Sequence, residues 1–282
     1  MNRNLLIRIA TAVVAVPLLI LFLELGGLFV SVGLLVAAAL AAYEYFAVVA
    51  KDDRLTQAVG VAAAASLAAI STWGPLMPVR SEARMSSATL LLVMVVLMCV
   101  AAFFLVRSGE MTTAWPRLAM LVGGALYTGL PLSFLARLRE IPEEGRLWCY
   151  LPMVLTWGND TFAYFCGRAF GKHKLAPAIS PGKTWEGAMG AAFLTVGAAF
   201  VWRAVAMPSL TVADCVGLGL GISLLGPIGD LTESVWKRSA GIKDSGTMIP
   251  GHGGLLDRID ALMFTAPYLY FFAEFLHPWR PF

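Results

Sequence analysis

The groups in this sequence that could do chemistry are densest in one stretch, residues 229–260. The stretch mixes carboxylates with lysines and arginines, and it adds one of the three histidines and a cluster of glycines. Carboxylate oxygens suit Mg²⁺, which typically takes one or two carboxylates together with substrate phosphates, while lysine and arginine bind phosphate oxygens. The glycines indicate a turn at which the backbone comes close to another group. The charged residues of the stretch are Asp230, Glu233, Asp244, Asp257, Asp260, Lys237, Arg238, Lys243 and Arg258.

Three of these carboxylates, Asp230, Asp257 and Asp260, are candidate ligands for Mg²⁺. Asp257 and Asp260 are three residues apart, so they share one face if a helix starts near residue 256. Asp230 closes the preceding apolar run at the same membrane boundary. Helix caps and boundary ion pairs are the alternative for each residue alone, but three together favour a metal site. Whether the site holds Mg²⁺ alone or also a second cation stays open.

A second polar block, residues 167–186, is mainly basic. Two apolar runs separate it from the first block, so both emerge on the same membrane face and could form one site for phosphates and a metal. Its Gly182-Lys183-Thr184 resembles part of a P-loop, but the glycine required five residues earlier is Pro177, and we expect no strand before it. We therefore exclude an NTPase. The charged residues of the block are Arg168, Lys172, Lys174, Lys183 and Glu186.

Other polar residues carry weaker signals. Asp160 lies within an apolar run and is a functional candidate because ionisable groups inside a membrane are costly. Glu44 is a weaker candidate, since its side chain can snorkel to the inner surface. His252, between two glycines, could be a general base, but a loop histidine is more often a hydrogen-bond donor. The basic residues of the first block would alone indicate a membrane-surface loop.

The composition places the chain among integral membrane proteins. Its hydrophobic fraction is 59% and its charged fraction 14%, against about 45–50% and 25% in soluble proteins. The net charge of +3 and the absence of a basic tail give no nucleic-acid signal. The four cysteines have no paired spacing, which argues against disulfides and zinc.

We predict an all-α polytopic membrane protein with about nine transmembrane helices, because each apolar run has about the twenty residues that a span needs. Residues 1–145 would hold five spans, and residues 146–282 would hold four together with both polar blocks. The first run is long, and we expect it not to be a cleaved signal peptide. Gly226, Pro227 and Gly229 predict a helix break just before Asp230. The expected spans are 5–23, 27–50, 57–76, 86–106, 118–136, 147–166, 187–207, 212–229 and 259–277.

The distribution of lysine and arginine orients the chain. With the N-terminus inside, the inner loops hold about two thirds of the 21 basic residues, as the positive-inside rule requires. Both polar blocks then face the cytoplasm. Without the two blocks the bias disappears, so this topology depends partly on the site itself.

The stretch SVWKRSAGIKDSGTMIPGHGGLLDRID, residues 234–260, resembles the signature of the phosphatidate cytidylyltransferase family, also called CDP-diacylglycerol synthases. NDTFAYFCGRAFGKHKLAPAISPGKTWEG, which begins at Asn159, is similar to a second block of that family. The resemblance covers about residues 157–190 and 226–262, and the first 150 residues resemble the family only in being apolar. The matching signature residues are Ser234, Lys237, Arg238, Lys243, Asp244, Pro250, His252, Gly253, Gly254, Asp257, Arg258 and Asp260.

This resemblance implies that CTP and phosphatidic acid react to give CDP-diacylglycerol and pyrophosphate, with Mg²⁺ on Asp230, Asp257 and Asp260. The reaction needs positioning and charge neutralisation rather than a strong base. The implied catalytic residues are Lys237, Arg238, Lys243, Asp244, His252 and Arg258. The implied substrate contacts are Asp160, Ser180, Lys183, Thr184, Glu186, Ser234, Gly253 and Gly254.

The partners implied are CTP, phosphatidic acid and the lipid bilayer of a bacterial inner membrane, with the site on the cytoplasmic face and no nucleic acid. A monomer and a homodimer both stay open. One alternative function is a CDP-alcohol phosphotransferase, whose pattern begins with Asp-Gly, a dipeptide absent here. Another is a non-enzymatic anion transporter, against which stand the lack of an internal repeat and the clustering of charge at one face.

Overall fold

A computed structural model describes residues 3–73, 82–107 and 109–277. Most of them are helical, and a helix covers most of each of the nine predicted spans. The last three residues of the third predicted span, 74–76, lie outside the described part. The helices are α1 (Arg3–Leu25), α2 (Gly27–Val49), α3 (Arg54–Trp73), α4 (Glu82–Arg107), α5 (Met111–Gly129), α6 (Ser133–Arg139), α7 (Gly145–Phe170), α8 (Trp185–Val205), α9 (Val212–Ser239), α10 (Leu256–Phe271) and the π-helix η2 (Phe272–Leu276); the strands are β1 (Lys174–Ala176) and β2 (Ser180–Thr184).

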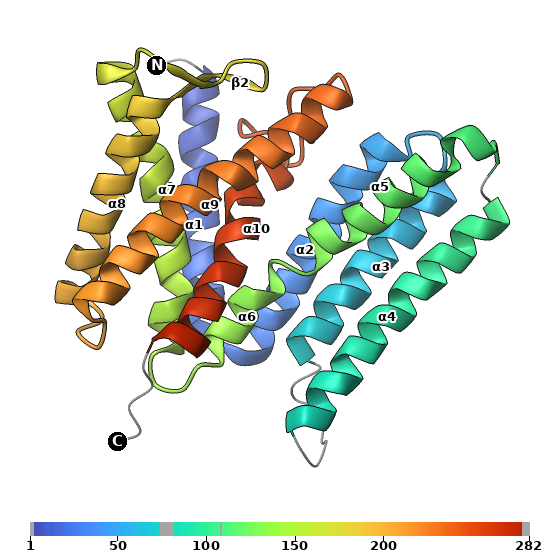
Figure 1. The fold of residues 1–282 in the computed structure, drawn as a ribbon, viewed down its shortest axis with the longest axis horizontal. Coiled ribbons are helices and arrows are strands. Elements are labelled where there is room, and N and C mark those ends of the chain that lie inside the picture. The colour runs from blue at the N-terminus through green and yellow to red at the C-terminus, as the bar shows by residue number, and fades with distance from the viewer. Residues whose placement is uncertain (1–2, 74–81, 108, 278–282) are drawn as a thin grey trace. The chain divides into compact units, whose positions relative to one another are not determined.

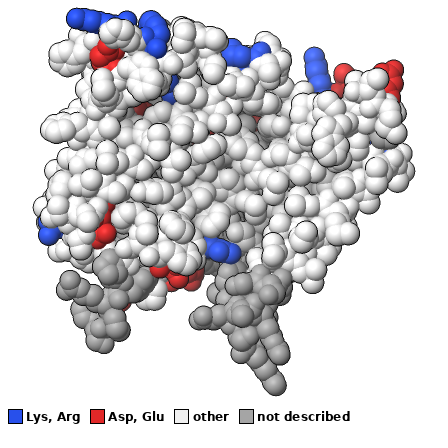
Figure 2. Space-filling view, in the orientation of Figure 1, with Lys and Arg blue, Asp and Glu red and all other residues white. Residues whose placement is uncertain are grey.

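Long apolar helices confirm the prediction of an all-α membrane protein, though not the number of its spans. Within the described residues, seven helical segments are long and apolar enough to cross a membrane, and α1 has a shorter apolar part. Many large apolar side chains point outward from these helices, as lipid-facing positions require. On the face in Figure 2, charged side chains gather near helix ends and leave the lengths between them uncharged. The full count of nine spans stays a prediction.

The chain forms two compact units. The first comprises residues 1–137 and 245–256, and the second comprises residues 138–244 and 257–282. The segment 245–256, which carries His252, thus belongs with the N-terminal helices, while Asp257 and Asp260 belong with the second unit.

Small residues let the helices of the first unit approach closely. In this unit α2, α3 and α5 pack on one another, and α4 packs on α3 (Figure 1). A Cβ at Gly60 would lie 2.5 Å from the ring of Phe46, and one at Gly129 would lie 2.5 Å from the carbonyl oxygen of Ala64. Such glycine contacts are typical of membrane helix interfaces, where close packing replaces the hydrophobic effect.

In the second unit α7 packs on α8 and α9, and α8 packs on α9. The β1–β2 hairpin stands at the end of α7 and the start of α8 (Figure 1). Buried hydroxyl groups link the helices, since the Thr156 and Thr265 hydroxyls lie 3.0 Å apart and Thr195 donates to Asn159 at 3.1 Å. These interhelical bonds fix the register in which α7, α8 and α10 present their polar residues.

The predicted helix break before Asp230 is wrong. Helix α9 runs without interruption from Val212 to Ser239 and includes Pro227. A proline removes only one backbone N–H donor. Membrane helices tolerate this loss because neighbouring groups form hydrogen bonds with the backbone groups that are freed. Gly229 serves packing instead, because a Cβ there would lie 2.5 Å from the carbonyl oxygen of Asp260.

Three further differences follow from local structure. The stretch expected as a loop from residue 230 starts only at Ala240, so the first half of the polar block is helical. The loop 167–186 contains a two-stranded antiparallel hairpin, and Gly182-Lys183-Thr184 lies within its second strand, where we expected none. The fifth predicted span ends early, at Gly129, and a short helix, α6, follows it. Cys99, Cys149, Cys166 and Cys215 form no disulfide bonds with one another.

Candidate active site

The second unit contains a cavity of about 600 Å³ that is lined by both polar blocks. Helices α7, α8, α9 and α10 and the hairpin each contribute to it. It gathers acids and bases from positions up to a hundred residues apart in the sequence, so the two blocks do meet on one side of the unit. The predicted site residues among its lining are Asp160, Ser180, Lys183, Thr184, Asp230, Lys237, Asp244, Asp257, Arg258 and Asp260.

The hairpin is fixed at its base by Thr184 and Glu186. Thr184 is the N-cap of α8, and its hydroxyl accepts a hydrogen bond from the backbone N–H of Gly187. The carboxylate of Glu186 accepts from the backbone N–H groups of Lys172 and His173 and lies 2.6 Å from Nδ1 of His173. Glu186 therefore closes the hairpin, and it is not among the cavity lining; its substrate contact stays a prediction.

Lys183 reaches from the hairpin to α9. Its Nζ lies 2.6 Å from Oδ2 of Asp230, and both side chains remain partly exposed. The ion pair joins the basic block to the acidic block at the cavity wall. An ion pair that is partly exposed adds little stability, so the same lysine can turn to a phosphate at small cost.

Lys237 is buried between two carboxylates. Its Nζ donates to Glu233, one turn back on α9, and to Oδ1 of Asp257 at 2.6 Å. Glu233 is fully buried, and its second oxygen makes no hydrogen bond within the described structure. Glu233 is one of the charged residues of the first polar stretch, but we predicted no role for it. The signal for this ion pair was the i, i+4 spacing of Glu233 and Lys237, which brings two side chains together on a helix. We missed it because we expected this part of α9 to be a loop.

Three carboxylates concentrate negative charge in the cavity. Asp160, Asp230 and Asp260, from α7, α9 and α10, lie close enough to repel one another electrostatically. Oδ1 of Asp260 accepts the backbone N–H of Ala261 at 2.7 Å. Repulsion of this kind is relieved by a bound cation or by lysines, and here Lys183 and Lys237 supply part of the compensation.

These carboxylates do not by themselves form a complete metal site. Among the described residues no group of three or more acids, histidines or cysteines has the arrangement of a preformed metal site. Asp230 and Asp257 are each paired with a lysine. The oxygen donors nevertheless fit Mg²⁺, which binds in nucleotide sites through a few carboxylates and completes its shell with water and phosphate.

Other predicted residues lie away from the cavity lining. Ser234 is buried and donates to Oδ1 of Asp230 at 3.3 Å, so it orients that carboxylate. Arg238 is exposed and donates to the carbonyl oxygen of Ile242 at the end of α9. Lys243 is exposed as well. The roles of these three residues in the reaction stay predictions.

His252 and the two glycines after it belong to the first unit. His252 closes a turn, because its N–H donates to the carbonyl oxygen of Ile249 at 2.9 Å. Pro250 and Gly251, with φ of 74° at the glycine, occupy the centre of this turn, as a type II turn requires. Nδ1 of His252 lies 3.4 Å from the carbonyl oxygen of Pro250.

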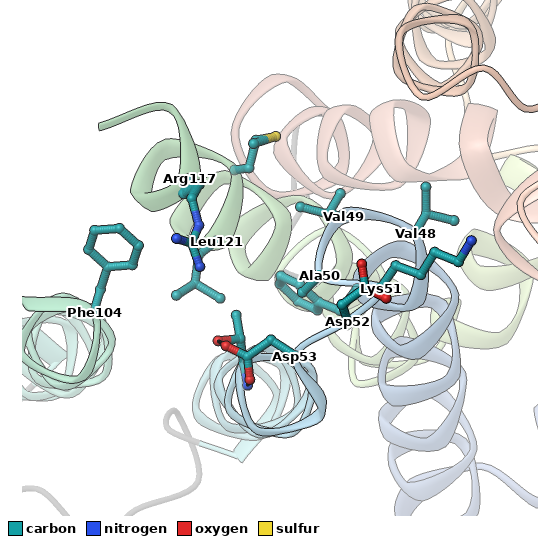
Figure 3. Close-up of a pocket in the computed structure, with 12 residues that line it drawn as sticks. Val48, Val49, Ala50, Lys51, Asp52, Asp53, Phe104, Arg117 and Leu121 are labelled. Atoms are coloured by element: carbon teal, nitrogen blue, oxygen red, sulfur yellow. Dashed lines mark hydrogen bonds between the residues drawn. The ribbon is translucent and has the colours of Figure 1, made fainter. Parts of the chain in front are cut away.

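The first unit has a cavity of its own, of about 440 Å³ (Figure 3). Asp53, one of its two acidic residues, caps α3: it accepts from the N–H of Thr56 at 3.1 Å and from its hydroxyl at 2.7 Å, and it pairs with Arg107 at 3.2 Å. The Thr56 hydrogen bonds, with that arginine, lower the pKa of Asp53 to about 2. The guanidinium of Arg117 lies 6.0 Å from the ring centre of Phe104. The carboxylate of Asp53 is thus engaged within the protein.

Comparison with known proteins shows similarity to one family over most of the chain. A family profile described as "Cytidylyltransferase family" matches residues 6–276. A phosphatidate cytidylyltransferase of Bacillus subtilis is 38% identical over 147 residues, 52% of this chain and 55% of that protein. One of Haemophilus influenzae is 43% identical over 138 residues (46% and 48%), and one of Brucella abortus is 41% identical over 179 residues (63% and 64%). The aligned regions thus span 48% to 64% of these relatives.

Proposed function

Because the chain belongs to the cytidylyltransferase family, we propose that it transfers the cytidylyl group of CTP to phosphatidic acid, giving CDP-diacylglycerol and pyrophosphate. The observation that carries the proposal is the cavity of the second unit. Its wall combines lysines that can hold phosphates with carboxylates that can hold Mg²⁺. The relatives named above are phosphatidate cytidylyltransferases, which supports this substrate pair.

In the proposed reaction a phosphate oxygen of phosphatidic acid attacks the α-phosphorus of CTP. A bond forms between that oxygen and the α-phosphorus, and the bond from the α-phosphorus to the oxygen that leads to the β-phosphorus breaks. Pyrophosphate leaves with the electron pair. The attacking phosphate is already ionised near pH 7, so the main obstacles are the repulsion of two polyanions and their alignment.

The lysines of the cavity meet these obstacles. Lys183 stands on the hairpin, where a small displacement from Asp230 would bring its ammonium group to a phosphate. Lys237 is held by Glu233 and Asp257, so its charge is fixed in place before substrate arrives. Fixed charges of this kind stabilise a transition state more effectively than mobile ones, because they need no reorganisation. Arg258, also in the lining, is a further phosphate partner.

We assign Mg²⁺ to Asp230, Asp257 and Asp260. When bound, the ion would neutralise the nucleotide phosphates and polarise the α-phosphoryl group. The mutual repulsion of Asp230 and Asp260 supports a cation here. Asp160, across from them on α7, adds negative charge that would strengthen the attraction.

We further propose that the chain lies in a bacterial inner membrane with nine spans, its N-terminus inside and the cavity facing the cytoplasm, where CTP is made available. The basic residues of both polar blocks support this orientation.

One assay tests the function. Purified protein receives labelled CTP, phosphatidic acid in mixed micelles and Mg²⁺, and the products are separated into lipid and water phases. We expect cytidine label in the lipid phase and one pyrophosphate for each labelled lipid. Transfer of the phosphatidyl group of added CDP-diacylglycerol to an alcohol with release of CMP, and no lipid label from CTP, would replace the proposal with a CDP-alcohol phosphotransferase. Anion uptake into vesicles without any cytidine transfer would replace it with a transporter.

A further inference from the structure

A buried acid of the first unit, Glu44, is the unexpected partner of the segment 245–256. We expected its side chain to snorkel to the inner surface, but it is only 4% exposed and lies among the buried residues near the C-terminal end of α2. Its Oε1 accepts the backbone N–H of Leu255 at 3.0 Å, and its Oε2 accepts the N–H of Leu256 at 2.9 Å and the hydroxyl of Ser245 at 3.1 Å. One carboxylate therefore holds both ends of the segment.

The glycines of the segment make room for this carboxylate. A Cβ at Gly254 would lie 2.5 Å from Oε2 of Glu44, and one at Gly246 would lie 2.7 Å from Oε1. This is the close backbone approach that the glycine cluster predicted, and the group approached is a protein side chain. Ser245 is also buried, so the donors that Glu44 serves are shielded from water. A buried N–H group that is left without an acceptor destabilises the fold.

Further contacts hold the middle of the segment. Ile249 and Gly253 form an isolated β-bridge, with the N–H of Ile249 donating to the carbonyl oxygen of Gly253 at 2.9 Å. The hydroxyl of Thr11, on α1, donates to the carbonyl oxygen of Pro250 at 3.0 Å. The turn at Pro250 is thus tied to α1, while the two ends of the segment are tied to α2.

The position of Leu256 gives this anchoring a functional consequence. Leu256 is the first residue of α10, where backbone N–H groups have no partner within the helix. Glu44 supplies the missing acceptor, as a capping side chain would. The next residue in the chain is Asp257, which pairs with Lys237 and lines the cavity of the second unit. The start of α10, and hence the direction in which Asp257 leaves the backbone, depends on that hydrogen bond.

We propose that Glu44 is a positioning residue for the reaction: by anchoring Ser245, Leu255 and Leu256 it sets the start of α10 and with it the carboxylate of Asp257. The expected effect of Glu44 on the reaction rests on the proposed function, whereas the anchoring of the segment does not. A carboxylate suits the task because both its oxygens accept. Glutamine would turn an NH₂ group toward at least one of the three donors.

The direct test replaces Glu44 by glutamine and by aspartate in the full-length protein. Hydrogen–deuterium exchange of the peptides that cover 245–256 is measured alongside the Mg²⁺ dependence of cytidylyl transfer. In Glu44→Gln we expect faster exchange in this segment and an increase of about tenfold in the Mg²⁺ concentration for half-maximal rate, the low end of the effect of losing a group that orients a metal ligand. Glu44→Asp should lie between Glu44→Gln and wild type. Ser31→Ala, another buried polar residue of α2, is the matched control and should change neither quantity.

A merely structural role gives a different result. It would reduce the amount of folded enzyme, and so the maximal rate, while the Mg²⁺ dependence of the folded fraction stayed at the wild-type value; that outcome overturns the proposal. If Glu44→Gln does not fold, Ser245→Ala, which removes one of the three donors, must still raise the Mg²⁺ requirement, and an unchanged requirement there overturns it equally. If wild-type protein transfers no cytidylyl group, the proposed function fails, and unchanged exchange in Glu44→Gln would then refute the anchoring separately.

Discussion

The cavities of the two units differ in how their charges are compensated. In the first unit Asp53 has a complete set of local partners, a helix N-terminus, a threonine hydroxyl and Arg107. In the second unit Asp160, Asp230 and Asp260 repel one another, and the lysines beside them compensate only part of the charge. Both cavities contain acids and bases, so composition alone does not separate them.

The difference indicates where a ligand is needed. A group whose partners lie within its own unit stabilises the fold and gains little from a ligand. Carboxylates that are held close together despite their repulsion raise the free energy of the empty site. A bound cation, or a polyanion that brings a cation with it, lowers that free energy. We therefore expect substitutions in the second cavity to affect turnover and those in the first to affect mainly stability.

The largest effect should come from the carboxylates at the start of α10. Asp257→Asn and Asp260→Asn should each reduce kcat/KM at least about a hundredfold, as the loss of one strong electrostatic contact to the transition state does. An amide oxygen supplies no net charge to Mg²⁺ or to Lys237. Activity is measured across a Mg²⁺ titration, with membrane insertion and melting temperature as controls. Near wild-type turnover at saturating Mg²⁺ would remove the metal role of the residue concerned.

Lys237 should affect both stability and turnover. Lys237→Ala leaves Glu233 and Asp257 buried without their shared partner, and breaking such a buried pair typically costs about 3–5 kcal/mol. We expect kcat/KM per folded molecule to fall at least about tenfold, or about 1.4 kcal/mol of transition-state stabilisation. Lys237→Ala/Glu233→Gln should recover part of the stability without the activity. Recovery of both would show that Lys237 acts only in the fold.

Substitution of Lys183 should separate an effect on turnover from an effect on stability. Its ion pair with Asp230 is partly exposed, so Lys183→Ala should change the free energy of unfolding by less than about 1 kcal/mol. If the lysine holds a substrate phosphate, kcat/KM should still fall about tenfold. Lys51→Ala, an exposed lysine outside both polar blocks and outside this cavity lining, is the comparison. Equal small losses at both lysines would mean that the hairpin only attracts anionic lipid.

The sequence was a good guide to the helices and to the membership of the cavity, because apolar runs and clustered charges are local properties. It failed where a residue's partner is distant. Pro227 and Gly229 have the composition of a break, but their neighbours in space preserve the helix. Because we expected a loop from residue 230 onward, we also missed the pairing of Glu233 with Lys237. Glu44 lies about two hundred residues from the segment that it anchors, so no spacing rule could connect them.

The smallest effect on turnover should come from the cavity of the first unit. Asp53→Ala removes the N-cap of α3 and should lower the free energy of unfolding by about 1 kcal/mol, while kcat/KM changes less than about twofold, as for substitutions away from a site. Asp52→Ala, at the neighbouring position, and Lys51→Ala, in the same cavity lining, are the controls and should leave both quantities near wild type.

The pH dependence of stability gives a further test of the role of Asp53. The pKa of Asp53 is lowered from 3.8 to about 2 in the folded protein, so its stabilising contribution is fully present above about pH 4 and is lost as the pH falls towards 2. The stability difference between wild type and Asp53→Ala should therefore shrink over this range, as measured by thermal unfolding in detergent at fixed salt. A difference that stays constant between pH 5 and pH 2.5 would show that the charge of Asp53 does not contribute. A large loss of turnover in Asp53→Ala at neutral pH would instead make the first cavity a participant in the reaction and abolish the contrast between the two units.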